Sequence, residues 1–156
     1  MIRKATQQDI EKVMQIWLKA SLQAHDFIAA DFWRQRLPEV RDVYLPQAET
    51  FVYEDKHQIK GFISVILDNF IGALFVDTAY QRRSIGSKLL DYVRQNRPNL
   101  TLKVYARNKA ALNFYQKNDF KILVEKKDDA TGENELIMSW AKGCKSGFQK
   151  RCQGDS

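Results

Sequence analysis

Residues 74–90 constrain the fold more than any other stretch of the 156-residue sequence. The apolar run Leu74-Phe75-Val76 leads into a polar turn with Arg82 and Arg83, and an amphipathic helical pattern begins at Ile85. A strand that passes directly into a helix leaves backbone N–H groups and the positive end of the helix dipole beside these two cations. The junction therefore predicts a site for a phosphate or pyrophosphate, and with it a nucleotide-like ligand.

Periodicity and turn residues predict the element order β, α, α, β, β, β, α, β, α, β, β. Strands are expected over residues 2–5, 51–54, 59–67, 70–76, 101–105, 120–125 and 136–140. A capping box, Thr6-x-x-Asp9, predicts the start of the first helix, and apolar spacing predicts another helix over residues 85–97. Pro38 is expected to open a short helix that reaches Tyr44 and ends before Pro46. Hairpins mixed with returning helices indicate an α/β fold of the mixed α+β kind.

Two single residues carry local predictions. Gly72 interrupts an apolar strand, which indicates a central strand covered on both faces and a place of close backbone approach. Asn108 precedes a helical pattern that runs to Asn118 and Asp119, so it is expected to cap that helix.

Length and composition favour one domain over residues 1–142, followed by a basic tail at 143–156 that is expected to be disordered. The net charge is +6, and half of that excess lies in residues 142–156, so nucleic-acid binding is the weaker explanation. Both cysteines, Cys144 and Cys152, fall in the tail, and His25 and His57 are far apart in sequence, so neither a disulfide framework nor a metal site is expected. Without an apolar run of about 18 residues, we expect a cytoplasmic protein that does not span a membrane.

Two motifs point to a family. Gln81-Arg82-Arg83-Ser84-Ile85-Gly86 does not match a Walker A loop or the dinucleotide fingerprint. It resembles motif A of the GNAT superfamily of N-acetyltransferases, Gln/Arg-x-x-Gly-x-Gly/Ala, with Ser84 where the family has glycine. Residues 108–120 resemble a second family motif, an Asn followed by an aromatic-Tyr pair and Gly-Phe, with Asp119 in place of that glycine. Over residues 2–140 the chain thus resembles a GNAT N-acetyltransferase, in particular small bacterial members that acetylate protein lysines.

The resemblance implies a GNAT-like central mixed, mostly antiparallel twisted sheet of about seven strands flanked by four helices. It also implies acetyl-CoA as the acetyl donor, and no metal. The strand backbone would pair with the pantetheine arm, the amides after it would hold the pyrophosphate, and Asn108 would bond the pantetheine amide. The implied cofactor-binding residues are Leu74, Phe75, Val76, Gln81, Arg82, Arg83, Ser84, Ile85, Gly86, Ser87, Asn108, Ala111, Phe114 and Lys117.

The implied chemistry is direct attack of a primary amine on the thioester, the first choice of acceptor being a lysine side chain of a protein or peptide. Tyr115 would protonate the leaving thiolate as general acid. A lysine amine has a reference pKa near 10.4, so it must lose a proton before it attacks, and Glu54 and His25 are the candidate bases. The implied substrate-contacting residues are Phe27, Trp33 and Asn69.

Several alternatives stay open. On pattern alone Tyr115 could be a core aromatic, Asn108 only a cap, and the arginines only solvated turn residues. Ser84 and Asp119, which replace family glycines, leave room for a non-catalytic acyl-CoA-binding regulatory module. The acceptor could instead be a small amine or an N-terminal amine, and the tail could serve a nucleic-acid binder. A homodimer through the last strands is also open.

Overall fold

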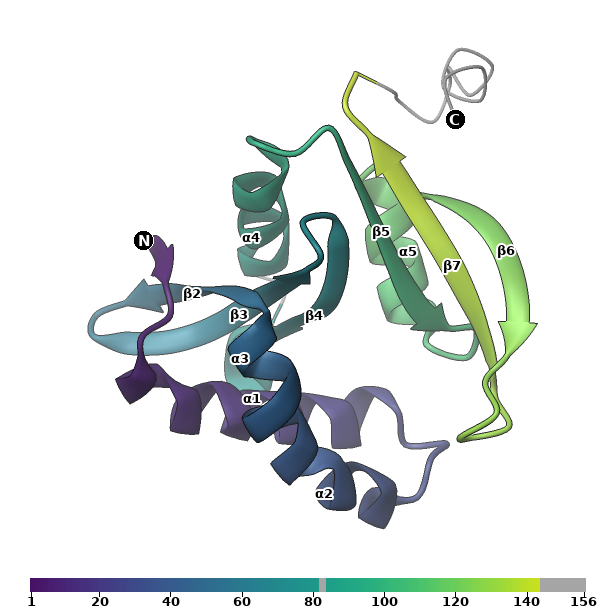
Figure 1. The fold of residues 1–156 in the computed structure, drawn as a ribbon, viewed down its shortest axis with the longest axis horizontal. Helices are drawn as coiled ribbons and strands as arrows, with labels where there is room; N and C mark the ends of the chain where they lie inside the picture. Colours follow the sequence, from purple (N-terminus) through teal and green to yellow (C-terminus); the bar gives the residue numbers. More distant parts are fainter. Residues whose placement is uncertain (82–83, 144–156) are drawn as a thin grey trace. The chain divides into compact units, whose positions relative to one another are not determined.

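The computed structural model describes residues 1–81 and 84–143 of the chain, which divides into two compact units, Met1–Gln95 and Asn96–Ser156. The order of its helices and strands is the predicted one, except that a longer helical segment over residues 30–47, with π-helical turns in it, replaces the second predicted helix (Figure 1). Arg82 and Arg83 lie outside the described residues. So do residues 144–156, which include both cysteines and all but Gly143 of the predicted tail.

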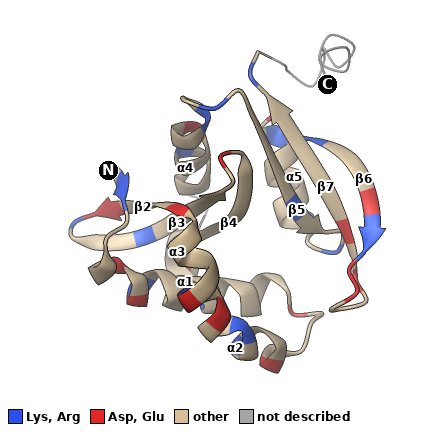
Figure 2. Cartoon of the chain, viewed as in Figure 1, with Lys and Arg blue, Asp and Glu red and all other residues tan. Residues whose placement is uncertain are grey.

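Four antiparallel strands form the sheet of the first unit in the order β1-β2-β3-β4. They are β1 (Ile2–Lys4), β2 (Glu49–Asp55), β3 (Gln58–Ile66) and β4 (Phe70–Val76). The helices of this unit are α1 (Ile10–Ala24), α2 (Ala30–Glu39), the three-residue α3 (Leu45–Gln47) and α4 (Ile85–Arg94). Short 3-10 turns lie at Gln7–Asp9 and Thr78–Tyr80, and α2 carries charged residues of both signs (Figure 2).

Strand β3 is the centre of the first core because helices cover both of its faces. A Cβ placed on Gly61 would lie 3.2 Å from Ile85 and 3.4 Å from Leu89, so this face packs on α4. The next residue, Phe62, points to the other face, where α1 contributes the buried Val13 and Trp17. The predicted stripe of α1 is thus confirmed as core packing at its central positions.

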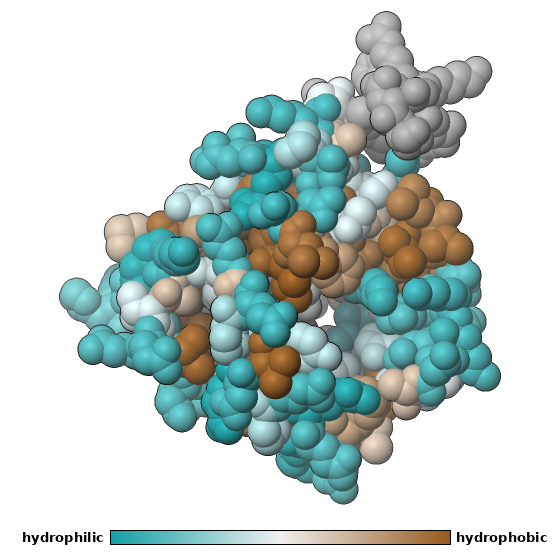
Figure 3. All heavy atoms as spheres, in the orientation of Figure 1, coloured by the Kyte–Doolittle hydropathy of each residue, from teal (hydrophilic) through white to brown (hydrophobic). Residues whose placement is uncertain are grey.

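The second unit has three antiparallel strands with β7 in the middle. They are β5 (Asn99–Tyr105), β6 (Lys121–Lys127) and β7 (Asn134–Ala141), and α5 (Lys109–Lys117) follows β5. Alternate residues of β5 and β7 are buried, among them Leu102 and Met138. Strand β6 instead exposes three consecutive apolar residues, Ile122, Leu123 and Val124 (Figure 3).

The expectation that Pro38 opens a helix is wrong. Helix α2 begins at Ala30, and Pro38 lies inside its last turn. The chain then continues as a π-helical segment, Val40–Tyr44, in which the Leu45 N–H donates to the carbonyl of Val40, five residues back. Pro46 does not end the helical segment either, because it lies in the first turn of α3, where no intrahelical N–H is needed.

Two further expectations are refined. Helix α4 ends at Arg94 rather than at residue 97. Gly72 is exposed, and it is the extra residue of a β-bulge, since Ser64 pairs with Ala73 and Val65 pairs with Ile71. The nearest atom to a Cβ at Gly72 would be the Ile66 Cδ1, at 2.8 Å, so the close approach inside the protein is to a side chain and not to backbone.

The seven strands and the four helices longer than one turn that the described residues contain confirm the predicted fold class. Within each unit, the described strands pair antiparallel, from β1 to β4 and from β5 to β7. Within residues 1–81 and 84–143, no helix is both long and apolar enough to cross a membrane.

Candidate active site

The turn after β4 begins at a buried carboxylate. Asp77 accepts a hydrogen bond from the Ala79 N–H at 3.1 Å, which caps the Thr78–Tyr80 turn. Two lysines on one face of α1 contact this carboxylate. The Nζ atoms of Lys12 and Lys19 each lie 3.6 Å from a carboxylate oxygen of Asp77. Burial alone would raise the pKa of Asp77, but the Ala79 amide and the two lysines lower it overall. These ion pairs therefore fix the turn that leads into the predicted anion site to α1.

The first turn of α4 has the features that an anion site needs. Ser84 adopts the left-handed conformation, with φ 64° and ψ 13°, and within the described residues its side chain makes no capping hydrogen bond. The amides of Ile85, Gly86 and Ser87 have no acceptor within the helix because they belong to its first turn. These N–H groups fit a diphosphate at the positive end of the helix.

The side chain of Gln81 folds back onto the end of β4, where its Nε2 donates to the carbonyl of Val76 at 3.3 Å. The predicted pantetheine-pairing residues Leu74, Phe75 and Val76 are half-buried in this strand. Gln81 therefore already uses one of the backbone acceptors that the pantetheine was expected to meet.

In the second unit, Asn108 and Tyr115 lie at the two ends of α5. The Oδ1 of Asn108 accepts the Ala111 N–H at 3.2 Å, which confirms the predicted cap. Tyr115 is buried edge-on between Phe114 and Phe120, with ring centroids 5.1 and 5.5 Å away. Burial raises the pKa of Tyr115 well above its usual range, so its hydroxyl stays protonated at neutral pH.

Each of the two predicted bases has a lowered pKa in the structure. The guanidinium of Arg3 holds Glu54 through two hydrogen bonds of 3.1 and 3.3 Å and lowers the pKa of its carboxyl. His25 is buried at the end of α1, and burial lowers its pKa to about 4, so it is neutral at pH 7.

Two of the predicted substrate residues belong to an aromatic cluster around His25. The His25 ring stacks on Trp33 at 5.0 Å and meets Phe27 edge-on at 6.0 Å, and Trp33 in turn meets Trp17 at 6.0 Å. The third, Asn69, lies apart in the exposed turn between β3 and β4. The structure thus brings His25, Phe27 and Trp33 together as a packed group.

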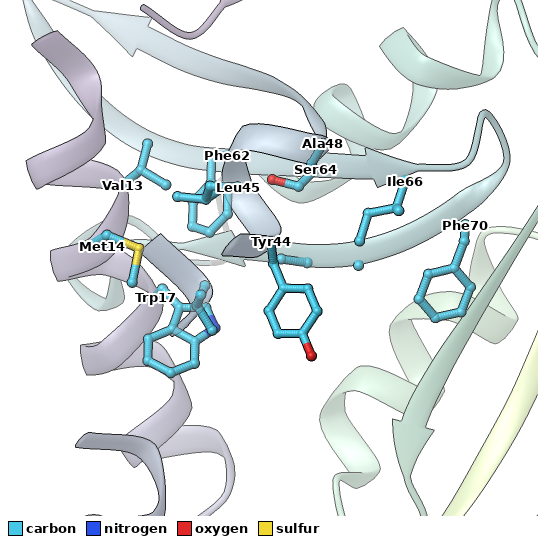
Figure 4. Close-up of a pocket in the computed structure, with 13 residues that line it drawn as sticks. Val13, Met14, Trp17, Tyr44, Leu45, Ala48, Phe62, Ser64, Ile66 and Phe70 are labelled. Carbon is cyan, nitrogen blue, oxygen red and sulfur yellow. The ribbon is translucent and has the colours of Figure 1, made fainter. Parts of the chain in front are cut away.

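A different set of residues forms a cavity of about 240 Å³ in the first unit (Figure 4). Its lining is apolar apart from Ser64 and Tyr44, and no charged side chain of the described part of the chain borders it. Helix α1, the π-helical segment and the strands β3 and β4 all contribute; the lining includes Val13, Met14, Trp17, Tyr44, Phe62 and Phe70.

A second cavity of about 560 Å³ has a mixed lining and is bordered by the charged residues Lys4, Glu11, Arg41 and Asp42. Leu45 and Ala48 line both cavities. Thr50 borders this second cavity and Ser64 borders the apolar one. A buried hydrogen bond of 2.8 Å between their hydroxyls connects the linings of the two cavities.

None of Glu54, His25, Phe27, Trp33 and Asn69 lines the apolar cavity. The cavity residues were missed because Val13, Met14 and Trp17 are indistinguishable in sequence from an ordinary core stripe. One sequence feature could have indicated the site: Ser64 is a lone hydroxyl within the apolar run of β3. Of the predicted cofactor-binding residues in the second unit, Ala111 and Phe114 are half-buried in α5 and Lys117 is exposed in its last turn.

Comparisons with known proteins agree with the fold and the motifs. Residues 46–122 match the family model described as acetyltransferase (GNAT) domain. The chain is 39% identical over 140 residues to the peptidyl-lysine N-acetyltransferase YiaC of Escherichia coli K12, covering 90% of this chain and 96% of YiaC. It is 29% identical to the peptidyl-lysine N-acetyltransferase YjaB of Salmonella typhimurium LT2, covering 88% and 94% of the two chains.

The solution structure of apo-form YjaB from Escherichia coli has the same fold, with a TM-score of 0.78, 26% sequence identity and coverage of 90% of this chain and 96% of that one. Fold, motif positions and relatives covering nearly the whole chain all point the same way. The chain belongs to the GNAT family of N-acetyltransferases.

Proposed function

We propose that this enzyme transfers an acetyl group from acetyl-CoA to the side-chain amine of a lysine in a protein or peptide. The observation that carries the choice of acceptor is the 39% identity, over 90% of this chain, with a relative named for peptidyl-lysine acetylation. The uncharged cavity of the first unit adds to it, because a lysine side chain is a flexible apolar stem that ends in an amine.

Acetyl-CoA is the proposed donor, and the first turn of α4 is the part of the chain that would hold its pyrophosphate. The amides of Ile85, Gly86 and Ser87 have no acceptor within the helix, so they supply hydrogen-bond donors for it, and among the described residues the Ser84 side chain does not cap them. Gln81 and the backbone of β4 from Leu74 to Val76 are the proposed contacts of the pantetheine arm.

The proposed chemistry is direct transfer. The neutral amine attacks the thioester carbonyl, a C–N bond forms, the C–S bond breaks, and the new amide nitrogen loses a proton to water. Tyr115 gives its hydroxyl proton to the departing thiolate, the role that its place in the second family motif implies. Asn108, Ala111, Phe114 and Lys117 are proposed to help bind the cofactor from α5.

The acceptor stem is proposed to lie in the apolar cavity. Trp17, Phe62 and Phe70 would pack against its methylene groups, and the hydroxyl of Ser64 is the one polar group on the floor. Phe27, Trp33 and Asn69 do not line this cavity, so any contact they make is proposed to be with other parts of the protein substrate.

The test is release of free CoA from acetyl-CoA in the presence of lysine peptides, peptides with only an N-terminal amine, and polyamines. We expect CoA release with lysine peptides, together with an acetylated lysine in their mass spectra. Ligand-induced stabilisation by acetyl-CoA without CoA release on any amine would instead show a non-catalytic acyl-CoA-binding module.

A further inference from the structure

The apolar cavity has two small neighbouring residues in its wall, Gly72 and Ala73 on β4. Ala73 pairs with Ser64, which also lines the cavity. Ile71 pairs with Val65 instead, and both of these are buried and do not line the cavity. The β-bulge therefore places Gly72 in the cavity wall, between a residue that faces the cavity and one that faces away from it.

The backbone at Gly72 does not require a glycine. Among the described residues, the glycines with positive φ are Gly132 and Gly143, so Gly72 has a conformation that other residues also adopt. A side chain at this position would instead meet Ile66. A Cβ on Gly72 would lie 2.8 Å from the Cδ1 and 3.4 Å from the Cγ1 of Ile66. The first distance is shorter than the usual contact of about 3.5–4.0 Å between carbon atoms, so one of the two groups would have to move.

Ile66 lines the same cavity, at the end that the β3–β4 hairpin forms. Figure 4 shows Ile66 and Phe70 on the side of the cavity away from the α1 residues Val13 and Trp17. A methyl group at position 72 would take up space at this end, either by itself or by displacing the Ile66 side chain. The missing side chain of Gly72 therefore leaves the hairpin end of the cavity longer by about the size of a methyl group.

We propose that Gly72, through Ile66, sets the length of the acceptor side chain and fits the cavity to the four-carbon stem of lysine. This inference rests on the proposed acetyl transfer to lysine, and it assigns the choice of chain length to two residues outside both family motifs. No charged side chain of the described residues borders the cavity, so apolar contacts along the stem determine which chain length fits. A missing or extra methylene in such a pocket changes specificity by about 10- to 200-fold.

The first test is Gly72→Ala, assayed by CoA release with two short peptides whose N-termini are blocked. One carries a single lysine, and the other carries ornithine, whose stem is shorter by a methylene. The wild-type enzyme should favour lysine by at least about tenfold in kcat/KM. In Gly72→Ala this ratio should fall by about tenfold, because the shortened cavity still fits ornithine. KM for acetyl-CoA should not change, because Gly72 is not a proposed cofactor contact.

The second test is a rescue by the double variant Gly72→Ala with Ile66→Val. Valine lacks the Cδ1 atom that the new Cβ would meet, so the ratio of lysine to ornithine should return to within about twofold of the wild-type ratio. Ile66→Val alone lengthens the cavity and should raise kcat/KM about tenfold for a homolysine peptide, which has an additional methylene.

Ile71→Val is the matched control. It deletes the same methyl group from the residue next to Gly72, but Ile71 is buried on the other face of the strand and does not line the cavity. The control should leave the relative kcat/KM values of the three peptides as they are in the wild type.

Three results would overturn this role of Gly72. They are a wild type without preference for lysine, a wild-type ratio in Gly72→Ala, and a lowered ratio that Ile66→Val does not restore. A general loss of structure would lower kcat/KM for both peptides alike, so the ratio separates the cavity from the stability of the fold. If Gly72→Ala melts below the assay temperature, the homolysine result with Ile66→Val decides.

Failure of the proposed function looks different. If the wild-type enzyme releases no CoA with any of the three peptides, acetyl transfer to lysine is wrong, and the choice of chain length is wrong with it. If the wild type acetylates the lysine peptide and every variant keeps the wild-type ratios, only the role of Gly72 is wrong.

Discussion

Two residues that replace family glycines both adopt the backbone conformation that favours glycine. Ser84 has φ 64° and Asp119 has φ 72°. The turn geometry typical of glycine is therefore present at both positions, and the Cβ of each residue strains the backbone there. The cost of the left-handed region is roughly 1–2 kcal/mol for an ordinary residue and smaller for Asp, whose short side chain can bond locally. The cofactor turn and the end of α5 thus carry conformational strain at one residue each.

This strain predicts that Ser84→Gly stabilises the enzyme by about 1 kcal/mol in the free energy of unfolding. Asp119→Gly should gain less, because Asp tolerates the left-handed region better than Ser does. Ser87→Gly is the control, since Ser87 has helical geometry in α4 and glycine there destabilises. Urea unfolding of the three variants gives the comparison, and a destabilised Ser84→Gly would contradict the strain.

A second prediction at this scale concerns the general acid. Tyr115→Phe should bind acetyl-CoA like the wild type but lose turnover by about 10²- to 10⁴-fold, the usual contribution of a positioned acid. Tyr105→Phe is the control. Burial and nearby carboxylates raise the pKa of Tyr105 to about 12, so it too is a buried phenol with a raised pKa. It has no proposed catalytic role, because its hydroxyl donates to Asp128. Single-turnover kinetics and calorimetry separate chemistry from binding, and unchanged turnover in Tyr115→Phe would remove Tyr115 from the role.

At the scale of elements, an ion-pair network ties the start of α1 to two strands. Arg3 on β1 bonds both oxygens of Asp9, at 2.7 and 3.0 Å, and also bonds Glu54 on β2. Asp9 in turn accepts the Thr6 N–H at 2.7 Å, which is the predicted capping box. Glu54 therefore has a structural partner in Arg3, and its role as a base stays a prediction.

The network predicts how stability depends on pH. The hydrogen bond with Arg3 outweighs burial and lowers the pKa of Asp9 from 3.8 to about 2. Because the pKa is lower in the folded chain, the carboxylate stabilises the fold by about 2 kcal/mol at pH values above the pKa of the unfolded chain. This contribution is lost as the pH falls from about 4 through about 2.

Asp9→Asn should therefore lose about 2 kcal/mol at pH 7, and the difference from wild type should vanish near pH 2. Denaturant titrations over this pH range measure it. Asp42→Asn, which removes an exposed ion pair, should change stability little at any pH. A wild-type-like Asp9→Asn at pH 7 would show that the network does not stabilise the fold.

A further prediction belongs to the β3–β4 hairpin. A Cβ on Gly61 would lie 3.0 Å from the Phe75 backbone oxygen and 3.2 Å from Ile85, neither of which can easily move. At Gly72 the nearest atom is the flexible end of Ile66, at 2.8 Å. Gly61→Ala should therefore cost about 1–3 kcal/mol and Gly72→Ala less than about 1 kcal/mol. Equal costs in chemical denaturation would contradict this distinction.

On the scale of the whole molecule, the chain divides into two compact units. The first turn of α4 and the apolar cavity belong to Met1–Gln95, and Asn108 and Tyr115 belong to the unit that begins at Asn96. The described part of the second unit comprises residues 96–143. This length is close to the roughly 40 to 60 residues below which a chain seldom folds alone. We therefore keep the prediction that residues 1–142 act as one domain.

One domain predicts that the two units unfold together. Amides of β3 and of β7 should show the same free energy of opening in hydrogen exchange with denaturant, because the second unit has too small a core to persist alone. Acetyl-CoA should raise both values by the same amount. Exchange of β7 at a lower denaturant concentration than β3 would show two independent domains.

Sequence alone determined the features that depend on local patterns. Strand alternation and the capping residues Thr6 and Asn108 predicted the element order. The two motifs predicted the family. These properties could be predicted because hydrogen bonds and side chains within a few residues produce them.

Tertiary structure alone decided which candidates meet. In the folded chain Glu54 forms an ion pair with Arg3, and His25 is buried beside Trp33. Tyr44 lies at an apolar cavity whose residues are typical of an ordinary core in the sequence. A helix reaching Tyr44 was predicted, but its start at Ala30 and its π-helical turns after Pro38 were not, because π-helical turns depend on packing rather than on propensity. Burial and long-range pairing set these properties, and neither is encoded by the spacing of residues along the chain.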